Sequence, residues 1–293
     1  LMVEDGRAAF IDTGTNHAVP RLLGALAALG LGVESVDWVI PTHVHLDHAG
    51  GAGLLMQSLP NARLLIHPRG ARHMIDPTAL YQGALAVYGE EEMQRSYGRL
   101  VGVPAERVVQ SHDEMRVQLG GRELLLLDTP GHARHHHCIW DARSRGCFTG
   151  DTFGLSYREF DTAGGPWIMP TSTPVQFEPE ALEASVERLL SLGPAQMFLT
   201  HYGRVGGSLA EVRRLARLLL SQAQAMTEIA LGLRAHPQRH GALKQALLAL
   251  YLQGLAEHGC ALARERQTAL LAMDVELNAQ GLGIWLDRAQ RPA

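Results

Sequence analysis

Short apolar runs alternate with amphipathic stretches along most of the chain. Apolar runs bounded by glycine, proline or other turn-forming residues predict strands, and apolar residues spaced three and four positions apart predict helices. The predicted strands cover residues 8–11, 36–42, 63–67, 115–119, 122–127, 137–141, 147–149 and 197–200. The predicted helices cover residues 19–29, 51–59 and a stretch that begins at Pro179. Because strands alternate with helices, the pattern predicts a layered α/β fold.

The pattern changes in two places. Residues 76–100 are polar and helix-prone, which predicts a helical insertion between core elements. The last third of the chain is helical to its end and carries apolar stripes, formed by Leu215, Leu218, Leu219, Leu247, Leu248, Tyr251 and Leu255. We expect these stripes to pack into a core between helices, with a homodimer interface as the alternative. The predicted organisation is a catalytic domain at residues 1–205, containing the insertion, and a helical extension at residues 206–293.

The densest group of metal-ligand residues lies between a predicted strand and a predicted helix. Within residues 42–51 it consists of His43, His45, Asp47 and His48. Imidazoles together with a carboxylate favour zinc, iron or manganese. A surface loop that merely happens to be rich in histidine is a poor explanation, because this run is much more specific than a lone histidine. All four side chains could bind one tetrahedral ion only with strain, so two neighbouring metal ions are the simpler interpretation.

Further polar residues stand where other predicted strands end. His132, Asp151 and His201 each follow such a strand and extend the group of candidate metal ligands. Asp12 follows the strand at residues 8–11, where it either hydrogen-bonds to a ligating imidazole or caps the next helix. Three consecutive histidines occupy residues 135–137. Because side chains alternate between the faces of a strand, we expect one of these three to support a ligand rather than to bind metal itself.

A long stretch without clear periodicity runs from residue 153 to Pro174 and is rich in glycine and proline. Long irregular loops inside compact domains are often functional. Tyr157 on this loop, and Tyr202 directly after His201, are therefore the candidates for contacts with a substrate.

The composition narrows the class of partner. The chain has 293 residues, of which 46% are hydrophobic and 19% charged, and its net charge of -4 would not attract nucleic acid or an anionic membrane. No apolar run reaches the roughly 18 residues of a membrane span, and no secretion signal is visible. The three widely spaced cysteines contain no C-x-x-C pair, which argues against a disulfide framework and a thiolate zinc site. We expect a cytoplasmic protein that acts on a small molecule.

These motifs resemble those of the metallo-β-lactamase-fold hydrolases, most closely their glyoxalase II-like branch. The resemblance spans about residues 8–202 and rests on five separated motifs in the family's order, namely Asp12-Thr13-Gly14, the His43, His45, Asp47 and His48 run, Gly131-His132, Gly150-Asp151 and Thr200-His201. It implies a four-layer αββα sandwich followed by the helical extension. It also implies two divalent metal ions, most readily zinc, with iron or manganese as alternatives. One ion would be held by His43, His45 and His132, and the other by Asp47, His48 and His201, with Asp151 as the bridge.

The implied reaction is hydrolysis. Two cations that share a water lower its pKa, so that a bridging hydroxide can attack a carbonyl or phosphoryl centre. Asp47 and Asp151 are the catalytic carboxylates, because they offset part of the metal charge. The expected substrate is a small ester, thioester or lactone: the basic residues that hold glutathione in glyoxalase II have no match around Lys244, and the common zinc β-lactamases place a cysteine where Asp151 stands. The alternative is a mononuclear iron oxidoreductase similar to the persulfide dioxygenases.

Overall fold

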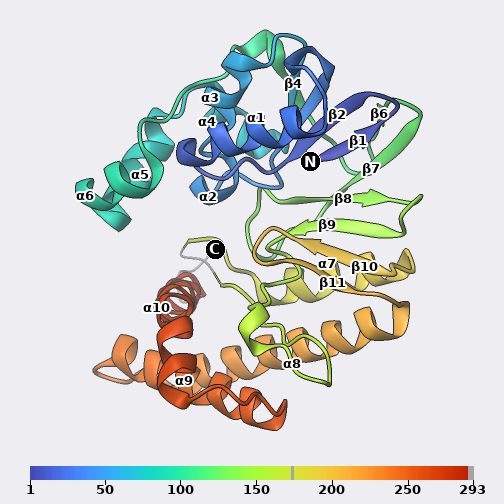
Figure 1. Cartoon of the computed structure of the whole chain (residues 1–293). Coiled ribbons are helices and arrows are strands. Elements are labelled where there is room, and N and C mark those ends of the chain that lie inside the picture. The colour runs from blue at the N-terminus through green and yellow to red at the C-terminus, as the bar shows by residue number, and fades with distance from the viewer. Residues whose placement is uncertain (173–174, 290–293) are drawn as a thin grey trace. The chain divides into compact units, whose positions relative to one another are not determined.

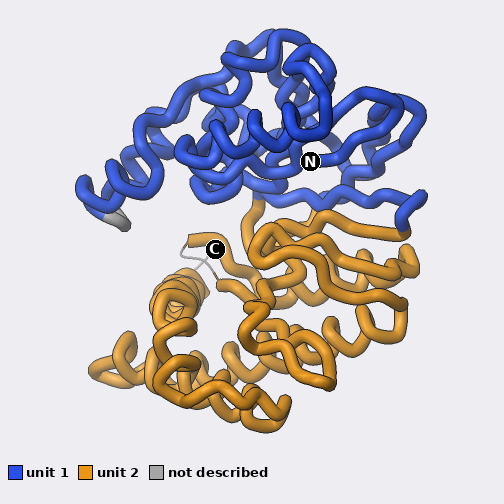
Figure 2. The backbone as a smooth tube through the Cα atoms, viewed as in Figure 1, with its two compact units in different colours: residues 1–128, 135–144 blue, residues 129–134, 145–293 orange. Residues whose placement is uncertain are grey.

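A computed structural model of the chain describes residues 1–172 and 175–289, in two compact units. Unit 1 contains Leu1–Asp128 and His135–Ser144, and unit 2 contains Thr129–Arg134 and the chain from Arg145 onward (Figure 2). The strands belong to two sheets and are accompanied by helices, so the predicted mixed α/β fold with C-terminal helices is confirmed. Pro174, at the end of the predicted loop, and the last four residues of the predicted extension lie outside the described residues.

Unit 1 contains a five-stranded sheet in the order β1-β2-β3-β4-β5. Strand β1 (Met2–Glu4) pairs antiparallel with β2 (Arg7–Ile11), and β3 (Val36–Ile40), β4 (Arg63–Ile66) and β5 (Val108–Gln110) follow in parallel. In β4 three consecutive residues are buried, which is why the sequence shows a continuous apolar run rather than alternation. A parallel sheet covered on both faces produces that pattern.

Helices α1 (Val19–Ala28), α3 (Ala52–Ser58) and α4 (Pro68–Ile75) accompany this sheet (Figure 1). They share with it one hydrophobic core, whose members include Phe10, Leu26, Val39, Leu55 and Leu64. The shorter elements of unit 1 are η1 (Asn16–Ala18), η2 (Val33–Ser35), α2 (Leu46–Ala49) and η4 (Ala105–Arg107). Residues predicted as a helical insertion form α5 (Thr78–Tyr88), α6 (Glu90–Glu92) and the π-helix η3 (Met93–Tyr97).

Unit 1 also contains an antiparallel run of three strands. Strand β7 (Arg122–Asp128) pairs with β6 (Arg116–Leu119) on one side and with β8 (His137–Asp141) on the other. Alternate residues of β6 are buried, as expected for a strand with one face toward a core. The indole Nε1 of Trp38 in β3 donates a hydrogen bond to the carbonyl of Gln118 in β6, at 2.9 Å. This bond joins the five-stranded sheet to β6 within the unit.

Unit 2 contains strands β9 (Gly146–Gly150), β10 (Gln196–Leu199) and β11 (Gly203–Gly206). Strands β9 and β10 run parallel, whereas β10 and β11 are antiparallel. The connection between β9 and β10 holds η5 (Arg158–Phe160) and helix α7 (Pro179–Ser191). Strand β11 was not predicted, because two of its four residues are glycine and only Val205 is buried.

Three helices complete unit 2: α8 (Leu209–Gly232), α9 (Arg239–Glu257) and α10 (Arg264–Arg288) (Figure 1). They form one core with residues of the loop after β9, including Tyr157 and Trp167. Of the predicted apolar stripes, Leu247, Tyr251 and Leu255 are fully buried in this core and Leu218 and Leu248 pack against it. The expected packing between helices is confirmed for these five residues. Across the described residues, each helix falls short of the length or the apolar character that a membrane span requires.

Candidate metal centre

The four ligand candidates of unit 1 surround the start of the short helix α2. His43 precedes it, His45 is its N-cap residue, and Asp47 and His48 lie inside it. The sequence predicted a loop here, because a helix of four residues is too short to show an apolar period. His43 and His48 are fully buried, while His45 and Asp47 are partly exposed.

Asp12 organises this cluster from the end of β2. One of its carboxylate oxygens accepts a hydrogen bond from the Nδ1 of His48 at 2.9 Å, and the other accepts from the backbone N–H of Thr42 at 2.7 Å. The Thr42 hydroxyl also donates to Asp12, at 3.0 Å, so it accepts from the Nδ1 of His43 at 3.1 Å. In this arrangement His43 and His48 carry their protons on Nδ1, so the lone pair of each ring that could bind a metal is on Nε2.

The residues after Asp12 explain the Asp-Thr-Gly motif. The backbone N–H of Thr13 and its hydroxyl both donate to the carbonyl of His48, at 2.7 and 3.0 Å. Gly14 adopts a φ of +65°, in the left-handed region that glycine enters without steric cost, and its carbonyl accepts from the N–H of Gly51 at 2.8 Å. The turn therefore anchors both ends of the segment that carries Asp47 and His48.

The imidazoles of unit 1 gather closely. The Nε2 of His43 lies 2.8 Å from the Nδ1 of His45, and the Nε2 of His48 lies 3.4 Å from a carboxylate oxygen of Asp47. The ring of His136 stacks on that of His43 with centroids 4.9 Å apart. Imidazole nitrogens and carboxylate oxygens are the donor atoms that bind metal ions such as zinc.

His137 supports the same segment from β8; the sequence predicted a supporting role for one of the three histidines at 135–137 without indicating which. Its backbone N–H donates to the carbonyl of Thr42 at 2.9 Å, and its Nε2 donates to the carbonyl of Pro41 at 3.0 Å. Its Nδ1 accepts from the hydroxyl of Ser111 at 2.9 Å. Complete burial, with a smaller effect from His67, lowers the pKa of His137 to about 4. This histidine is therefore neutral at physiological pH.

The three ligand candidates of unit 2 follow strands β7, β9 and β10. Because β9 and β10 are parallel and Gly150 is paired with Leu199, Asp151 and His201 leave the sheet at the same edge. One carboxylate oxygen of Asp151 lies 3.4 Å from the Nε2 of His132, and the other lies 3.5 Å from the Nε2 of His201. Asp151 thus divides its two oxygens between two histidines.

His132 is fixed by contacts on its other ring nitrogen. Its Nδ1 lies 3.2 Å from the carbonyl oxygen of Thr171 and 2.9 Å from the Thr171 hydroxyl. The preceding Gly131 has a φ of +134°, and a Cβ atom there would lie 2.4 Å from backbone atoms of Leu182 in α7. Close approach of α7 thus explains the glycine of the Gly-His motif.

The two tyrosines singled out in the sequence pack against each other in unit 2, with their ring planes tilted by 31°. Their ring centroids lie 4.3 Å apart, with the Tyr202 side chain 47% exposed and Tyr157 buried. The Tyr157 hydroxyl donates to a carboxylate oxygen of Asp274 in α10 at 2.7 Å. Burial raises the pKa of Tyr157, and burial also raises the pKa of Asp274 despite the hydrogen bond from Tyr157 and the proximity of His201. The sequence did not indicate Asp274, because α10 has no ligand-like spacing.

The fold and these clusters correspond to a known class of protein: the chain belongs to the Metallo-beta-lactamase superfamily, whose family pattern matches residues 1–201. Histidine and aspartate clusters in this fold indicate metal binding. A particular relative is the metallo-beta-lactamase fold-containing protein ST1585 of Sulfurisphaera tokodaii, which is 26% identical over 183 residues. The matched segment covers 61% of this chain and 65% of that protein, so it spans less than two thirds of the relative's length.

Solved structures agree with the family assignment. The crystal structure of ST1585 has a TM-score of 0.63 at 20% identity and covers 96% of this chain and 90% of that chain. The metallo-beta-lactamase family protein TTHA1429 from Thermus thermophilus has a TM-score of 0.65 at 21% identity and covers 99% and 87%. A third structure, TTHA1623 in a di-iron-bound form, is 25% identical with a TM-score of 0.50, covering 70% of this chain and 86% of that one. The first two show a shared fold alone.

Proposed function

We propose that this chain is a metal-dependent hydrolase of the glyoxalase II-like branch, with two divalent ions and a small ester, thioester or lactone as substrate. The observation that carries the proposal is the position of Asp151, whose two oxygens face His132 and His201 separately. A carboxylate whose two oxygens face different histidines is better suited to bridging two metal ions than to binding one.

The spacing of donor atoms supports metal ligation within each unit. Two atoms bound tetrahedrally to one zinc ion at about 2.0–2.1 Å lie about 3.3 Å apart. The pairs Asp47–His48, His132–Asp151 and Asp151–His201 lie 3.4, 3.4 and 3.5 Å apart. Ordinary N–H···O hydrogen bonds are shorter, at about 2.9 Å. The donor set, made of imidazoles and carboxylates, suits zinc, iron or manganese.

Superfamily membership supports the division of ligands between the ions. The proposed sets are His43, His45 and His132 for one ion and Asp47, His48 and His201 for the other, with Asp151 shared. Bound ions of this kind acidify a coordinated water and polarise the bond to be hydrolysed. The chain's own residues would orient the imidazoles and fix their tautomers: Asp12 accepts the Nδ1 proton of His48, and Thr171 accepts that of His132. Asp47 and Asp151 would offset part of the positive charge.

Tyr202 is the proposed substrate-contacting side chain. Tyr202 is exposed, follows His201 directly and packs against the ring of Tyr157, whose hydroxyl donates to Asp274. Tyr157 would therefore act indirectly, by holding the ring of Tyr202 in place. The proposed partner is a small-molecule substrate, and the proposal involves neither nucleic acid nor a membrane.

A second candidate function is oxidation at a single iron ion, similar to that of the persulfide dioxygenases. The di-iron-bound form of TTHA1623 favours iron as a candidate metal. Both functions would use the same histidines, since imidazole binds iron and zinc. They differ in the number of ions and in the reaction, which makes them separable by experiment.

The test combines metal content with turnover. Protein purified without added metal would be analysed by plasma mass spectrometry, and turnover would be measured on ester, thioester and lactone substrates. About two ions per chain together with hydrolysis would support the proposal. One iron per chain, with no hydrolysis and with oxygen uptake in the presence of a persulfide, would favour the oxidoreductase instead.

Variants can distinguish the proposed metal ligands from a histidine that lies beside them. Asp151→Asn and His132→Ala should lower metal content and turnover together, because each removes a proposed donor. His136→Ala is the matched control: it removes a buried imidazole that stacks on His43 but is not a proposed ligand. Normal metal loading in both ligand variants would refute the assignment.

A further inference from the structure

Asn278 is a buried amide in the middle of α10. It is 2% exposed, and each polar atom of its side chain has a hydrogen-bond partner. Its Oδ1 accepts from the backbone N–H of Ser172 at 2.6 Å and from the Ser172 hydroxyl at 3.2 Å. Its Nδ2 donates to the carbonyl of Pro170 at 3.2 Å and to the hydroxyl of Tyr251 at 2.8 Å. A buried amide is unfavourable unless it is bonded in this way, and an aliphatic residue would satisfy packing alone.

The segment that Asn278 holds is the one that contacts His132. Thr171 lies between Pro170 and Ser172, so both of its neighbours are bonded to the same amide. The Thr171 carbonyl can only accept, and it lies 3.2 Å from the Nδ1 of His132. The Thr171 hydroxyl, 2.9 Å from the same nitrogen, is a second acceptor for its proton. That nitrogen therefore carries the proton, and the lone pair of Nε2 is directed at the site where Asp151 lies 3.4 Å away.

We propose that Asn278 is a positioning residue of the metal centre, acting through Thr171 to set the orientation and tautomer of His132. The inference rests on the proposed function in so far as His132 is taken as a ligand. It assigns a role in the support of His132 to the C-terminal helix α10, which is labelled in Figure 1. Partners that orient ligating histidines commonly change metal affinity by about 10–100-fold when they are removed.

If Asn278 had only a structural role, its replacement would lower stability without changing zinc affinity. The chain offers a matched control for that case. Gln222 of α8 is also a buried amide, 7% exposed, and its Nε2 donates to the carbonyl of Ile168 on the same loop at 2.6 Å. Its removal should destabilise the unit in a similar way without touching residues 170–172. Tyr251→Phe removes the bond between Asn278 and α9, together with the one from the Tyr251 hydroxyl to the sulfur of Met226. It leaves the contacts of Asn278 with Pro170 and Ser172 in place.

The first measurement is made on the full chain without metal. Imidazole ¹⁵N NMR, with the His132 signals assigned from their loss in His132→Ala, reports which ring nitrogen carries the proton. Wild type, Gln222→Leu and Tyr251→Phe should show the Nδ1–H form, whereas Asn278→Leu should show a mixture of tautomers. An unchanged Nδ1–H signal in Asn278→Leu would overturn the inference, whatever metal or substrate the protein uses.

The second measurement is zinc affinity by competition with a chromophoric chelator. Asn278→Leu and Thr171→Val should each bind zinc about 10-fold more weakly, and Thr171→Ser, which keeps the hydroxyl, should retain the wild-type affinity. Gln222→Leu should lose thermal stability without losing affinity. If Asn278→Leu loses stability as Gln222→Leu does but keeps its affinity, Asn278 is only structural. If wild type binds zinc but hydrolyses none of the test substrates, the proposed function fails and this inference stands.

Discussion

His137 should make the stability of the metal-free chain depend on pH. Its imidazole is 1% exposed, donates to Pro41 and accepts from Ser111, so the neutral form fits its surroundings. Burial lowers the pKa of His137 from the ordinary value of 6.5 to about 4. Below pH 6.5 the unfolded chain therefore binds a proton that the folded chain does not bind until about pH 4.

The sign and size of the effect follow from this difference. Folding stability should fall as the pH decreases from about 6.5 to about 4, and the loss should level off below that range. A pKa difference of about 2.5 units corresponds to about 3 kcal/mol, at about 1.36 kcal/mol per unit. Little discount for solvent screening applies, because the side chain is fully buried.

The assay is urea unfolding at a series of pH values, with a chelator present to keep the protein free of metal. His137→Gln retains a donor for Pro41 and an acceptor for Ser111 but cannot be protonated in this range. It should therefore unfold more easily at pH 7 yet lose about 3 kcal/mol less than wild type on acidification. His112→Gln, at an exposed histidine, serves as the control and should follow the wild-type curve. Parallel curves for wild type and His137→Gln would refute the reasoning.

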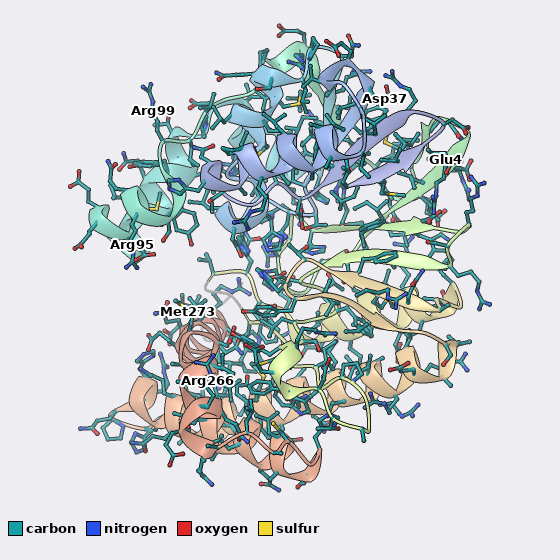
Figure 3. The ribbon with its side chains drawn as sticks, in the orientation of Figure 1. Glu4, Asp37, Arg95, Arg99, Arg266 and Met273 are labelled. Carbon is teal, nitrogen blue, oxygen red and sulfur yellow. The ribbon has the colours of Figure 1, made fainter. Side chains whose placement is uncertain are left out.

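Three further predictions concern packing and metal. Gly131→Ala should lower the free energy of unfolding by about 1–3 kcal/mol or more, because the new Cβ would lie 2.4 Å from backbone atoms of α7. Circular dichroism during urea unfolding measures this loss, and an unchanged unfolding midpoint would contradict it. Leu247→Ala should lower the free energy of unfolding by about 2–5 kcal/mol, because Leu247 is fully buried. Met273→Ala, on the exposed side of α10 (Figure 3), should change it by less than about 0.5 kcal/mol. Equal losses in the two variants would contradict the described core. Removal of metal by a chelator should lower the melting temperature of wild type, since a ligand at 100 times its Kd stabilises by about 2.7 kcal/mol, and Asp151→Asn should show a smaller decrease.

The sequence predicted the main strands because their burial leaves a local signal. In β4, residues Leu64, Leu65 and Ile66 are all buried, so the strand appears as an unbroken apolar run. The polar residue that follows such a run must stand at an edge of the sheet, which is how His132, Asp151 and His201 became candidate ligands. Strand β11 lacked this signal, since it forms by pairing with β10 rather than through its own apolar residues.

The short helix α2 and the turn at Asp12 show the limit of local pattern. A helix of four residues contains hardly more than one turn, so no periodicity could distinguish it from a loop. For Asp12 the sequence left two roles open, a bond to an imidazole or a helix cap. The described contacts include its hydrogen bond to His48, 36 residues away, which only the folding of β2 beside β3 brings about.

The candidate ligands and their positions after strands could thus be predicted from the sequence itself, because both depend on adjacent residues. The supporting contacts were decided by tertiary structure alone. Asn278 is 106 residues from Ser172, and His137 is 96 residues from Pro41. Hydrophobic periodicity records which face of an element is buried, but the partner of a buried polar group depends on which distant segment packs there. That is why Asn278 carried no recognisable signal in the sequence, and why the sequence could not indicate which of the histidines at 135–137 would have the supporting role.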